Sequence, residues 1–310
     1  MPGMHRFRLS MARKVNRRHL IQAVGALAIN GNLKGFVSGS IYTGNSKQIC
    51  LPVLNCYSCP GALTSCPIGS LQAVNNHPGF NFSFFVAGLL AVFGILAGRF
   101  YCGWLCPFGF LQDLLAKIRK KKIELKLDRP LRYLKYLILV LLVLLLPSIL
   151  VNEYNLGSPL FCKYICPAGT IEAGLPLLLV NTGLRSLVGV LFSWKLLLAI
   201  LTVVAAIFIT RFFCRYICPL GAILGIFHPV SLYRFGLDAT KCIDCGICAR
   251  VCPMDIDPIT EHNSPECIRC RNCINICPAS AITSNFAGLS IPNAKVRAAE
   301  RKKDRKTEKA

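Results

Sequence analysis

The sequence predicts an all-α polytopic membrane domain with about four transmembrane helices, followed by a small α+β domain. Three observations lead to this fold class. The 310-residue chain is 54% hydrophobic and has a mean hydropathy of +0.51, which is too apolar for an ordinary soluble protein. Its long apolar runs are separated by loops whose positive charge alternates from one loop to the next. The last part of the chain lacks apolar runs and carries regularly spaced cysteines.

The apolar runs define the predicted membrane-spanning segments, at about residues 20–42, 80–97, 133–151 and 196–210. Crossing the hydrocarbon core takes about 20 apolar residues. The first candidate is the weakest, because it contains Asn30, Asn32 and Lys34. The segment Ile171–Leu191 is also apolar, but it is interrupted by Pro176, Asn181, Gly183 and Arg185. We interpret it as a helix at the membrane interface, with a fifth span as the alternative.

The distribution of lysine and arginine predicts the orientation. The loop of residues 43–79 contains only Lys47, whereas residues 117–132 are rich in lysine and arginine. The loop after the third run is again poor in positive charge, and the chain beyond Arg211 is basic. Because positive loops stay in the cytoplasm, we expect a multi-pass protein of the cytoplasmic (inner) membrane with both termini cytoplasmic. The net charge of +22 then reflects topology and membrane lipid, and nucleic acid is not an expected partner.

Changes in composition divide the chain into four regions. Residues 1–19 form a basic cytoplasmic arm, 20–232 the four-span membrane domain, 233–285 a cysteine-rich domain, and 286–310 a basic tail that we expect to be disordered. The pair Arg17 and Arg18 ahead of an apolar stretch leaves an export signal as an alternative, although no clear cleavage site follows.

The cysteine-rich region contains the most specific motif. It has two runs of the form C-x2-C-x2-C-x3-C-P, which begin at Cys242 and Cys267. This is the ligand pattern of bacterial ferredoxins, in which the fourth cysteine of each run binds the other cluster. The predicted ligands are Cys242, Cys245, Cys248 and Cys277 for one [4Fe–4S] cluster, and Cys267, Cys270, Cys273 and Cys252 for the other. We therefore expect a bacterial-type two-cluster ferredoxin domain. Structural zinc is the alternative, but zinc sites prefer paired C-x2-C knuckles.

A second motif, C-x3-C-P-x-G, recurs in the membrane domain. Full copies span Cys102–Gly109, Cys162–Gly169 and Cys214–Gly221, and a partial copy spans Cys66–Gly69, with Ala62 in place of its first cysteine. Proline is favoured at the first position of a helix, so the cysteine before it lies at the helix N-terminus. The positive end of the helix dipole favours a thiolate there. Each motif is thus suited to supply metal ligands.

The order of these motifs predicts two direct repeats, each with an outer and an inner motif. A pseudo-twofold axis along the membrane normal would bring like motifs together. The inner metal site would consist of Cys102, Cys106, Cys214 and Cys218, and the outer site would draw on Cys56, Cys59, Cys66, Cys162 and Cys166. One or two further Fe–S clusters are therefore expected in the membrane domain. Packing cysteines or a thiol-redox pair are the alternatives for the inner set, and disulfides for the outer set.

The remaining polar residues carry less signal. The five histidines are scattered without ligand spacing, so haem is not expected, and no catalytic residue is predicted. We interpret Lys195 as an interfacial anchor, and Glu153 and Glu172 as exposed loop carboxylates.

These motifs resemble those of NapH/NosR-type membrane-bound 4Fe–4S ferredoxins, also called polyferredoxins. The resemblance rests on Cys102–Pro107, Cys214–Pro219 and the two ferredoxin runs, and it covers residues 17–284. It implies four spans with a cytoplasmic ferredoxin domain, in proteins that move electrons between quinol or cytoplasmic donors and extracytoplasmic reductases. The outer motifs and the lack of a recognisable flavin site depart from the family pattern.

We therefore expect a membrane-integral iron–sulfur electron-transfer protein. It would pass electrons between cytoplasmic ferredoxin clusters and a quinone pool or extracytoplasmic acceptor, with a cytoplasmic donor as redox partner and quinone as a further cofactor. The alternatives are a quinol dehydrogenase subunit of a reductase system, and a redox sensor or metal-centre assembly factor. Sites at opposite faces of a hydrocarbon core about 30 Å thick would be too far apart for one electron hop. Either the cysteine turns dip inward or a quinone bridges the gap.

Overall fold

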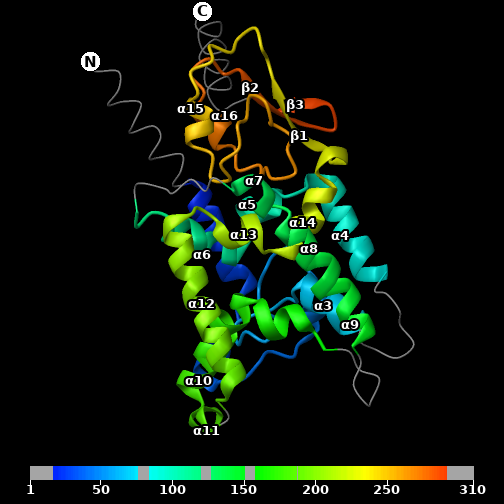
Figure 1. Ribbon diagram of the computed structural model, residues 1–310, viewed down its shortest axis with the longest axis vertical. Coiled ribbons are helices and arrows are strands. Elements are labelled where there is room, and N and C mark those ends of the chain that lie inside the picture. The colour runs from blue at the N-terminus through cyan, green and yellow to red at the C-terminus, as the bar shows by residue number, and fades with distance from the viewer. Residues whose placement is uncertain (1–16, 76–83, 120–126, 151–157, 187, 292–310) are drawn as a thin grey trace, which may run out of the picture.

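The computed structural model describes residues 17–75, 84–119, 127–150, 158–186 and 188–291. A helical part and a small cysteine-rich part lie at opposite ends of an elongated molecule (Figure 1). The cysteine-rich part carries the sheet, and α10 and α11 lie at the far end of the helical part.

Two described helices are long and apolar enough to cross a membrane. One is Asp128–Ile149, which includes α7 (Asp128–Leu131), α8 (Leu134–Ile138), the π-helix η2 (Leu139–Leu145) and α9 (Leu146–Ile149). The other is α12 (Val190–Phe208). Both helices expose apolar side chains such as Leu137 and Leu201, each of which is 54% accessible. These helices and a shorter apolar helix, α4 (Phe84–Ala97), overlap the last three predicted spans.

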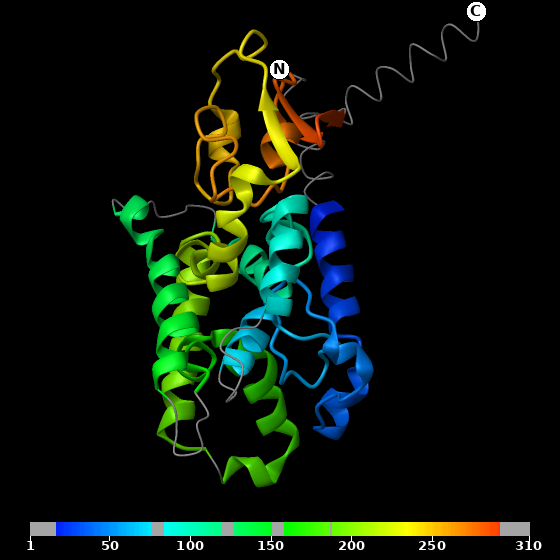
Figure 2. The ribbon, with the colours of Figure 1, turned by 90° about the vertical axis from the view of Figure 1, so that its right-hand side faces the viewer.

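The first predicted span is not one continuous helix. Residues 17–29 are helical, and α2 (Leu33–Ser38) follows after a break (Figure 2). The break has a polar cause. Asn30 exchanges side-chain hydrogen bonds with Asn55 at 3.1 Å, and the Asn32 side chain donates to the carbonyl of Pro60 at 2.9 Å. The asparagines therefore bind the returning chain of residues 50–66 instead of continuing the helix.

Short helices inside the helical part contain the first cysteine of a motif or begin just after its second cysteine. They are α3 (Pro67–Asn75), α5 (Phe100–Trp104), α6 (Pro107–Leu115), the π-helices η3 (Phe161–Ile165) and η4 (Gly169–Gly174), α13 (Phe212–Tyr216) and α14 (Pro219–Ile226). Both views place α3 between the two ends of the helical part (Figures 1 and 2). The segment predicted to lie at the interface forms η4, α10 (Leu175–Val180) and α11 (Thr182–Arg185), which together precede α12. The 3-10 helices η1 (Asn45–Gln48) and η5 (His228–Val230) complete the helical part.

The cysteine-rich part is built on a three-stranded antiparallel sheet of order β1-β2-β3. Its strands are β1 (Tyr233–Leu237), β2 (Ile282–Phe286) and β3 (Leu289–Ile291), and its helices are α15 (Ile247–Arg250) and α16 (Asn272–Ile276). In the register of β1 and β2, Tyr233 pairs with Phe286 and Leu237 with Ile282. The sheet packs through Tyr233, Phe235 and Ile282 on Cys248 and Cys273, so the strands hold both cysteine runs in place.

Candidate metal centres

The first set of ferredoxin-type cysteines surrounds a small cavity of about 20 Å³. Its lining includes Cys242, Cys245, Cys248 and Cys277, which are the four residues that the spacing assigns to one cluster. Two left-handed backbone positions, Asp244 (φ 47°) and Gly246 (φ 63°), turn the chain between the first three cysteines. The backbone N–H of Ala281 donates to Sγ of Cys277 at 3.4 Å. Such a bond favours the thiolate form that metal ligation requires.

The second set surrounds a separate cavity of about 20 Å³, whose lining includes Cys252, Cys267, Cys270 and Cys273. The N–H of Arg269 donates to Sγ of Cys267 at 3.4 Å. Burial raises the pKa of the Cys267 thiol to about 12 and that of Cys252 to about 11. Thiols this buried stay protonated unless a cation is present, so this donor set fits a metal cluster.

The inner set of four cysteines lies where two motifs meet. All four thiols, Cys102, Cys106, Cys214 and Cys218, are buried and lie within electrostatic reach of one another. Cys106 and Cys218 are the N-terminal caps of α6 and α14, each followed by proline at the first helical position. The N–H of Gly109 donates to Sγ of Cys106 at 3.4 Å. The structure therefore brings the two motifs together at one place.

Side chains from one inner motif hold the backbone of the other. Gln112 donates to Sγ of Cys214 at 3.1 Å and accepts the N–H of Phe213 at 3.0 Å. Arg99 donates to the carbonyl of Cys214 at 3.0 Å, and Arg211 donates to the carbonyl of Cys102 at 2.6 Å. None of these three residues is among those predicted from the sequence. The signal for the two arginines was the matching text RFYC and RFFC, in which an arginine stands three residues before Cys102 and Cys214.

The outer set surrounds a cavity of about 150 Å³, and the structure selects among the candidate cysteines. Its lining includes Cys56, Cys66, Cys162 and Cys166. Cys59 does not line it, and instead its Sγ lies 3.7 Å from Oδ1 of Asn30. Gln72 donates to Sγ of Cys162 at 3.3 Å and accepts the N–H of Phe161 at 3.2 Å. Gln72 thus repeats the contacts that Gln112 makes at the inner set.

Two further residues at the outer cavity differ from the sequence interpretation. Glu172 was expected to be an exposed loop carboxylate, but it lies on η4 and accepts the N–H of Cys56 at 2.7 Å. Lys195 was expected to be an interfacial anchor, but it lines the cavity. Both positions follow from the return of residues 50–66 toward the third motif, which the linear sequence does not reveal. Glu153 lies outside the described residues.

The inner and outer sets are close neighbours. Sγ of Cys106 lies 3.8 Å from the carbonyl oxygen of Leu54, which is two residues before Cys56. Two residues of extended chain span about 7 Å. Cys66, Cys106, Cys166 and Cys218 also belong to one continuous core cluster. The outer cysteine turns therefore lie next to the inner set within the helical part.

The cysteine-rich part is docked directly on the inner set. Trp104 on α5 donates to the carbonyl of Arg269 at 3.1 Å, and a Cβ on Gly103 would lie 2.4 Å from the carbonyl of Ile268. Arg99 also pairs with Glu266 at 2.9 Å, and Glu266 directly precedes Cys267. The second ferredoxin-type cavity is thus the one next to the inner set.

All eighteen cysteines have unbridged Sγ atoms. Within the described residues, no group of three or more His, Cys, Asp or Glu side chains is arranged to hold a single metal ion. The ferredoxin-type and outer cysteines instead surround cavities, the arrangement that a larger cluster needs.

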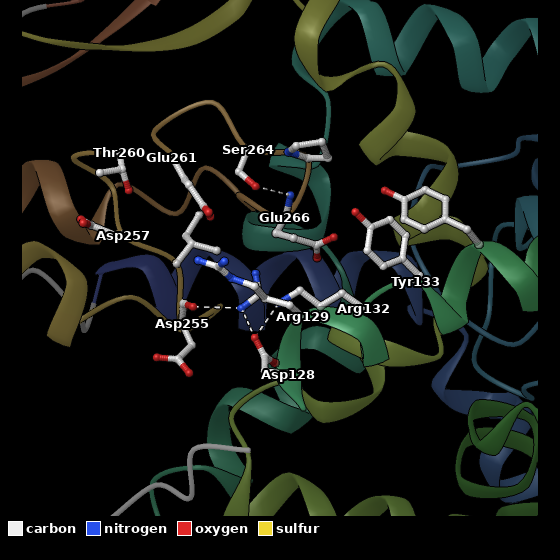
Figure 3. A pocket seen from close by; sticks show the side chains of 13 residues that line it. Asp128, Arg129, Arg132, Tyr133, Asp255, Asp257, Thr260, Glu261, Ser264 and Glu266 are labelled. Carbon is white, nitrogen blue, oxygen red and sulfur yellow. Dashed lines mark hydrogen bonds and ion pairs between the residues drawn. The ribbon is translucent and has the colours of Figure 1, made fainter. Parts of the chain in front are cut away.

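A fourth cavity, of about 620 Å³, lies at the junction of the two parts (Figure 3). Its walls are the start of the Asp128–Ile149 helix and the loop of residues 255–266. Arg132 pairs with Asp128 and donates to the carbonyl of Asp255 at 2.9 Å, and Tyr133 from the helix and Glu266 from the loop also line the cavity. The size suits a small molecule.

Comparisons with known proteins agree with this arrangement. A 4Fe–4S binding domain model matches residues 78–126, 136–175 and 191–236, and a 4Fe–4S dicluster domain model matches residues 234–278. An uncharacterized protein of Methanocaldococcus jannaschii is 34% identical over 55% of this chain and 57% of its own length. The Escherichia coli protein YccM, provisionally named as an electron transport protein, is 30% identical over 53% of this chain and 44% of its own length.

The ferredoxin-type protein NapH of Haemophilus influenzae is 27% identical over 53% of this chain and 51% of its own length. The methylamine utilization ferredoxin-type protein MauN and the regulatory protein NosR also match. The chain spans about half the length of the curated relatives that it matches. No solved structure matches it.

Together, the matches to 4Fe–4S domains and the cysteine-lined cavities define an iron–sulfur protein with ferredoxin-type 4Fe–4S domains. Within this class, the chain belongs to the NapH/NosR-type 4Fe–4S ferredoxin family.

Proposed function

We propose that the protein passes electrons across part of the membrane, between cytoplasmic ferredoxin clusters and a quinone pool or an extracytoplasmic acceptor. Each cysteine set would hold one [4Fe–4S] cluster, which supplies one-electron transfer. The four sets are Cys242, Cys245, Cys248 and Cys277; Cys252, Cys267, Cys270 and Cys273; Cys102, Cys106, Cys214 and Cys218; and Cys56, Cys66, Cys162 and Cys166.

The contact chain between the sets is the observation that carries this proposal. Trp104 and Gly103 touch the loop of Arg269, which lies between two ligands of the second ferredoxin set. Cys106 of the inner set touches Leu54, whose segment leads to Cys56 of the outer set. Electron tunnelling falls steeply with distance, so direct contact between successive sets favours a relay.

The proposed topology places both basic ends in the cytoplasm. The helix of residues 17–29, α4, Asp128–Ile149 and α12 would be the four crossing elements. The outer motifs would enter the membrane from the far side without crossing it. The scarcity of lysine and arginine in residues 43–79 supports this orientation.

Iron and sulfide analysis of anaerobically purified protein tests the relay. Four loaded clusters correspond to about sixteen irons per chain, and two correspond to about eight. Cys218→Ser and Cys162→Ser should each lose about four irons and keep the ferredoxin signals. Cys59→Ser is the matched control, since Cys59 bonds Asn30 outside the outer cavity, and it should lose none. About eight irons in the wild-type protein would mean that only the two ferredoxin sets are loaded, and would contradict the proposed membrane clusters.

The cavity of Figure 3 favours a second candidate function, a quinol dehydrogenase subunit of a reductase system. Tyr133 and Tyr136 line the cavity beside Glu266, and Glu266 adjoins a ligand of the second ferredoxin set. Quinol added without oxygen should then reduce the clusters. An unchanged visible and EPR spectrum after quinol addition would exclude this function and leave the relay intact.

A further inference from the structure

Two buried arginines are placed symmetrically about the inner set. Arg99 precedes Cys102 by three residues, and Arg211 precedes Cys214 by three. Both residues have 0% of their surface exposed. Each reaches across to the other motif, with Arg99 bound to the Cys214 carbonyl at 3.0 Å and Arg211 bound to the Cys102 carbonyl at 2.6 Å.

The glycine of each motif lets the opposite arginine approach. A Cβ on Gly221 would lie 3.1 Å from Nη2 of Arg99, and a Cβ on Gly109 would lie 3.4 Å from Nη1 of Arg211. The guanidinium groups therefore pack against the C-P-x-G turns that present the inner thiols. The exchange between the two motifs gives the inner site its pseudo-twofold symmetry.

Each arginine belongs to a buried ionic group with an excess of positive charge. Arg211 and Arg18 share Asp113, and Arg99 and Lys135 share Glu266. Each group has two cations and one carboxylate, so each has a net charge of one positive. Four buried thiolates with a cluster would be the nearby anionic partner for this excess.

Among the described residues, no arginine contacts the outer set in this way. The position three residues before Cys162 is Pro159, and the position three before Ala62, which stands for the missing cysteine, is Cys59. Of the described residues that line the outer cavity, Lys195 is the one cation, and Glu172 accepts the N–H of Cys56 at 2.7 Å. Glu172 adds no positive charge in either protonation state.

We infer that Arg99 and Arg211 are paired positioning residues that set the inner four-cysteine site at a higher reduction potential than the outer site. The inference rests on the proposed function. One electron, taken from a soluble donor such as dithionite, changes the charge of a [4Fe–4S] centre with four thiolates from about −2 to about −3. Buried cations stabilise the added charge strongly, because the surrounding dielectric constant is low. An electron shared by the two membrane sites therefore stays on the inner site.

Anaerobic redox titration monitored by EPR tests this inference on the full-length protein. Arg211→Gln should shift the inner midpoint potential to more negative values, and Arg211→Lys should keep it close to wild type. Asp113→Asn should shift it to more positive values, because it removes the carboxylate that offsets Arg18 and Arg211. The outer midpoint should change less in all three variants.

Arg211→Gln and Asp113→Asn each remove one partner of the same ion pair. An electrostatic effect shifts the inner midpoint potential in opposite directions in the two variants, whereas loosened packing would shift it in the same direction in both. Equal-sign shifts, or an inner potential that does not respond to either substitution, would overturn the inference. If Arg211→Gln does not fold, the other two variants still test the inference. Asp113→Asn must then make the inner midpoint potential more positive, and Arg211→Lys must leave it unchanged. Failure of the proposed function looks different, because Cys218→Ser would then lose no iron.

Discussion

Gln72 and Gln112 occupy equivalent positions in two motifs and make the same pair of contacts. Each follows its C-P turn in the text CPIGSLQ or CPFGFLQ. Each amide donates to a thiol of the partner motif and accepts the N–H of the phenylalanine before that thiol. The third motif has Glu172 at this position, and it holds the N–H of Cys56. In these three motifs, one side chain thus binds the backbone that presents the cysteines of the partner motif, whereas the fourth motif has Leu224 at this position.

We predict that Gln112→Leu disturbs the inner site alone. The substitution leaves the buried N–H of Phe213 without a partner, which should lower the free energy of unfolding by about 1–3 kcal/mol. It also removes a hydrogen bond to Sγ of Cys214, so the inner EPR signal should change. Gln72→Leu is the matched control and should change only the outer signal. Identical spectral changes in the two variants would contradict the assignment of each glutamine to one site.

His228 gives a pH dependence with a definite sign. It is 0% exposed, and neither ring nitrogen has a hydrogen bond within the described chain. Burial, with Arg269 nearby, lowers the pKa of His228 to about 2, from a usual value of about 6.5. Below pH 6.5 the unfolded chain binds a proton that the folded chain does not, so the stability falls as the pH falls.

The expected loss is up to about 1.4 kcal/mol per pH unit below 6.5. Between pH 6.5 and 5.5, where the unfolded histidine is still only partly protonated at the upper end, the unfolding free energy should therefore fall by about 1 kcal/mol more in the wild type than in His228→Leu. Parallel pH profiles for the two proteins would show that His228 is not the group responsible.

At the scale of elements, α5 and the loop after Cys267 meet backbone to backbone. A Cβ on Gly103 would lie 2.4 Å from the carbonyl oxygen of Ile268, so one of the two chains must move. We predict that Gly103→Ala loosens the docked ferredoxin part, at a cost of about 1–3 kcal/mol. Hydrogen exchange in residues 265–270 should rise.

Gly88 on α4 is the matched control for this prediction. A Cβ there has nothing within 4 Å, and replacing a helical glycine with alanine is favourable by about 1 kcal/mol. Gly88→Ala should therefore leave hydrogen exchange in residues 265–270 unchanged. A similar rise in both variants would mean that the contact of α5 with the loop is not what holds the two parts together.

Glu266 is the ionic link between the same elements. Although burial acts in the opposite direction, Arg99 and Lys135 hold the pKa of Glu266 below its usual range. Glu266→Gln leaves two buried cations without a carboxylate and should cost about 3–5 kcal/mol of unfolding free energy. Asp255→Asn breaks a more exposed pair with Arg215 and should cost less than about 1 kcal/mol. Chemical denaturation of both variants measures the difference, and equal costs would contradict a structural role for the buried group.

At the scale of the whole molecule, a cysteine set could be predicted from the sequence more completely when its members lie closer together along the chain. The ferredoxin runs have ligands at short fixed intervals, so chain geometry alone groups most of each set. The inner set could be proposed from two matching motifs and the charge rule. The choice of Cys56 and Cys66 over Cys59 could not, because it depends on how residues 50–66 fold back against Asn30 and Asn32.

The same fold-back explains the other differences from the sequence interpretation. Hydropathy describes Leu20–Tyr42 as one weak span, whereas its asparagines bind the returning chain and interrupt the helix. Glu172 and Lys195 were expected at the surface, because the sequence alone does not show that the returning chain brings Cys56 to the same cavity. Buried arginines such as Arg99 escaped notice because a single basic residue at a helix end usually faces solvent.

The contact between Cys106 and the carbonyl of Leu54 has a consequence for the membrane potential. Moving one charge across the full membrane against 100 mV involves about 2.3 kcal/mol. In the proposed topology, an electron that moved between these two adjoining sites would cross only part of the hydrocarbon core, so this step would feel only a fraction of that voltage. The greater part of the electrogenic work would fall on the final step, from the outer cavity to whatever accepts or donates the electron on the far side.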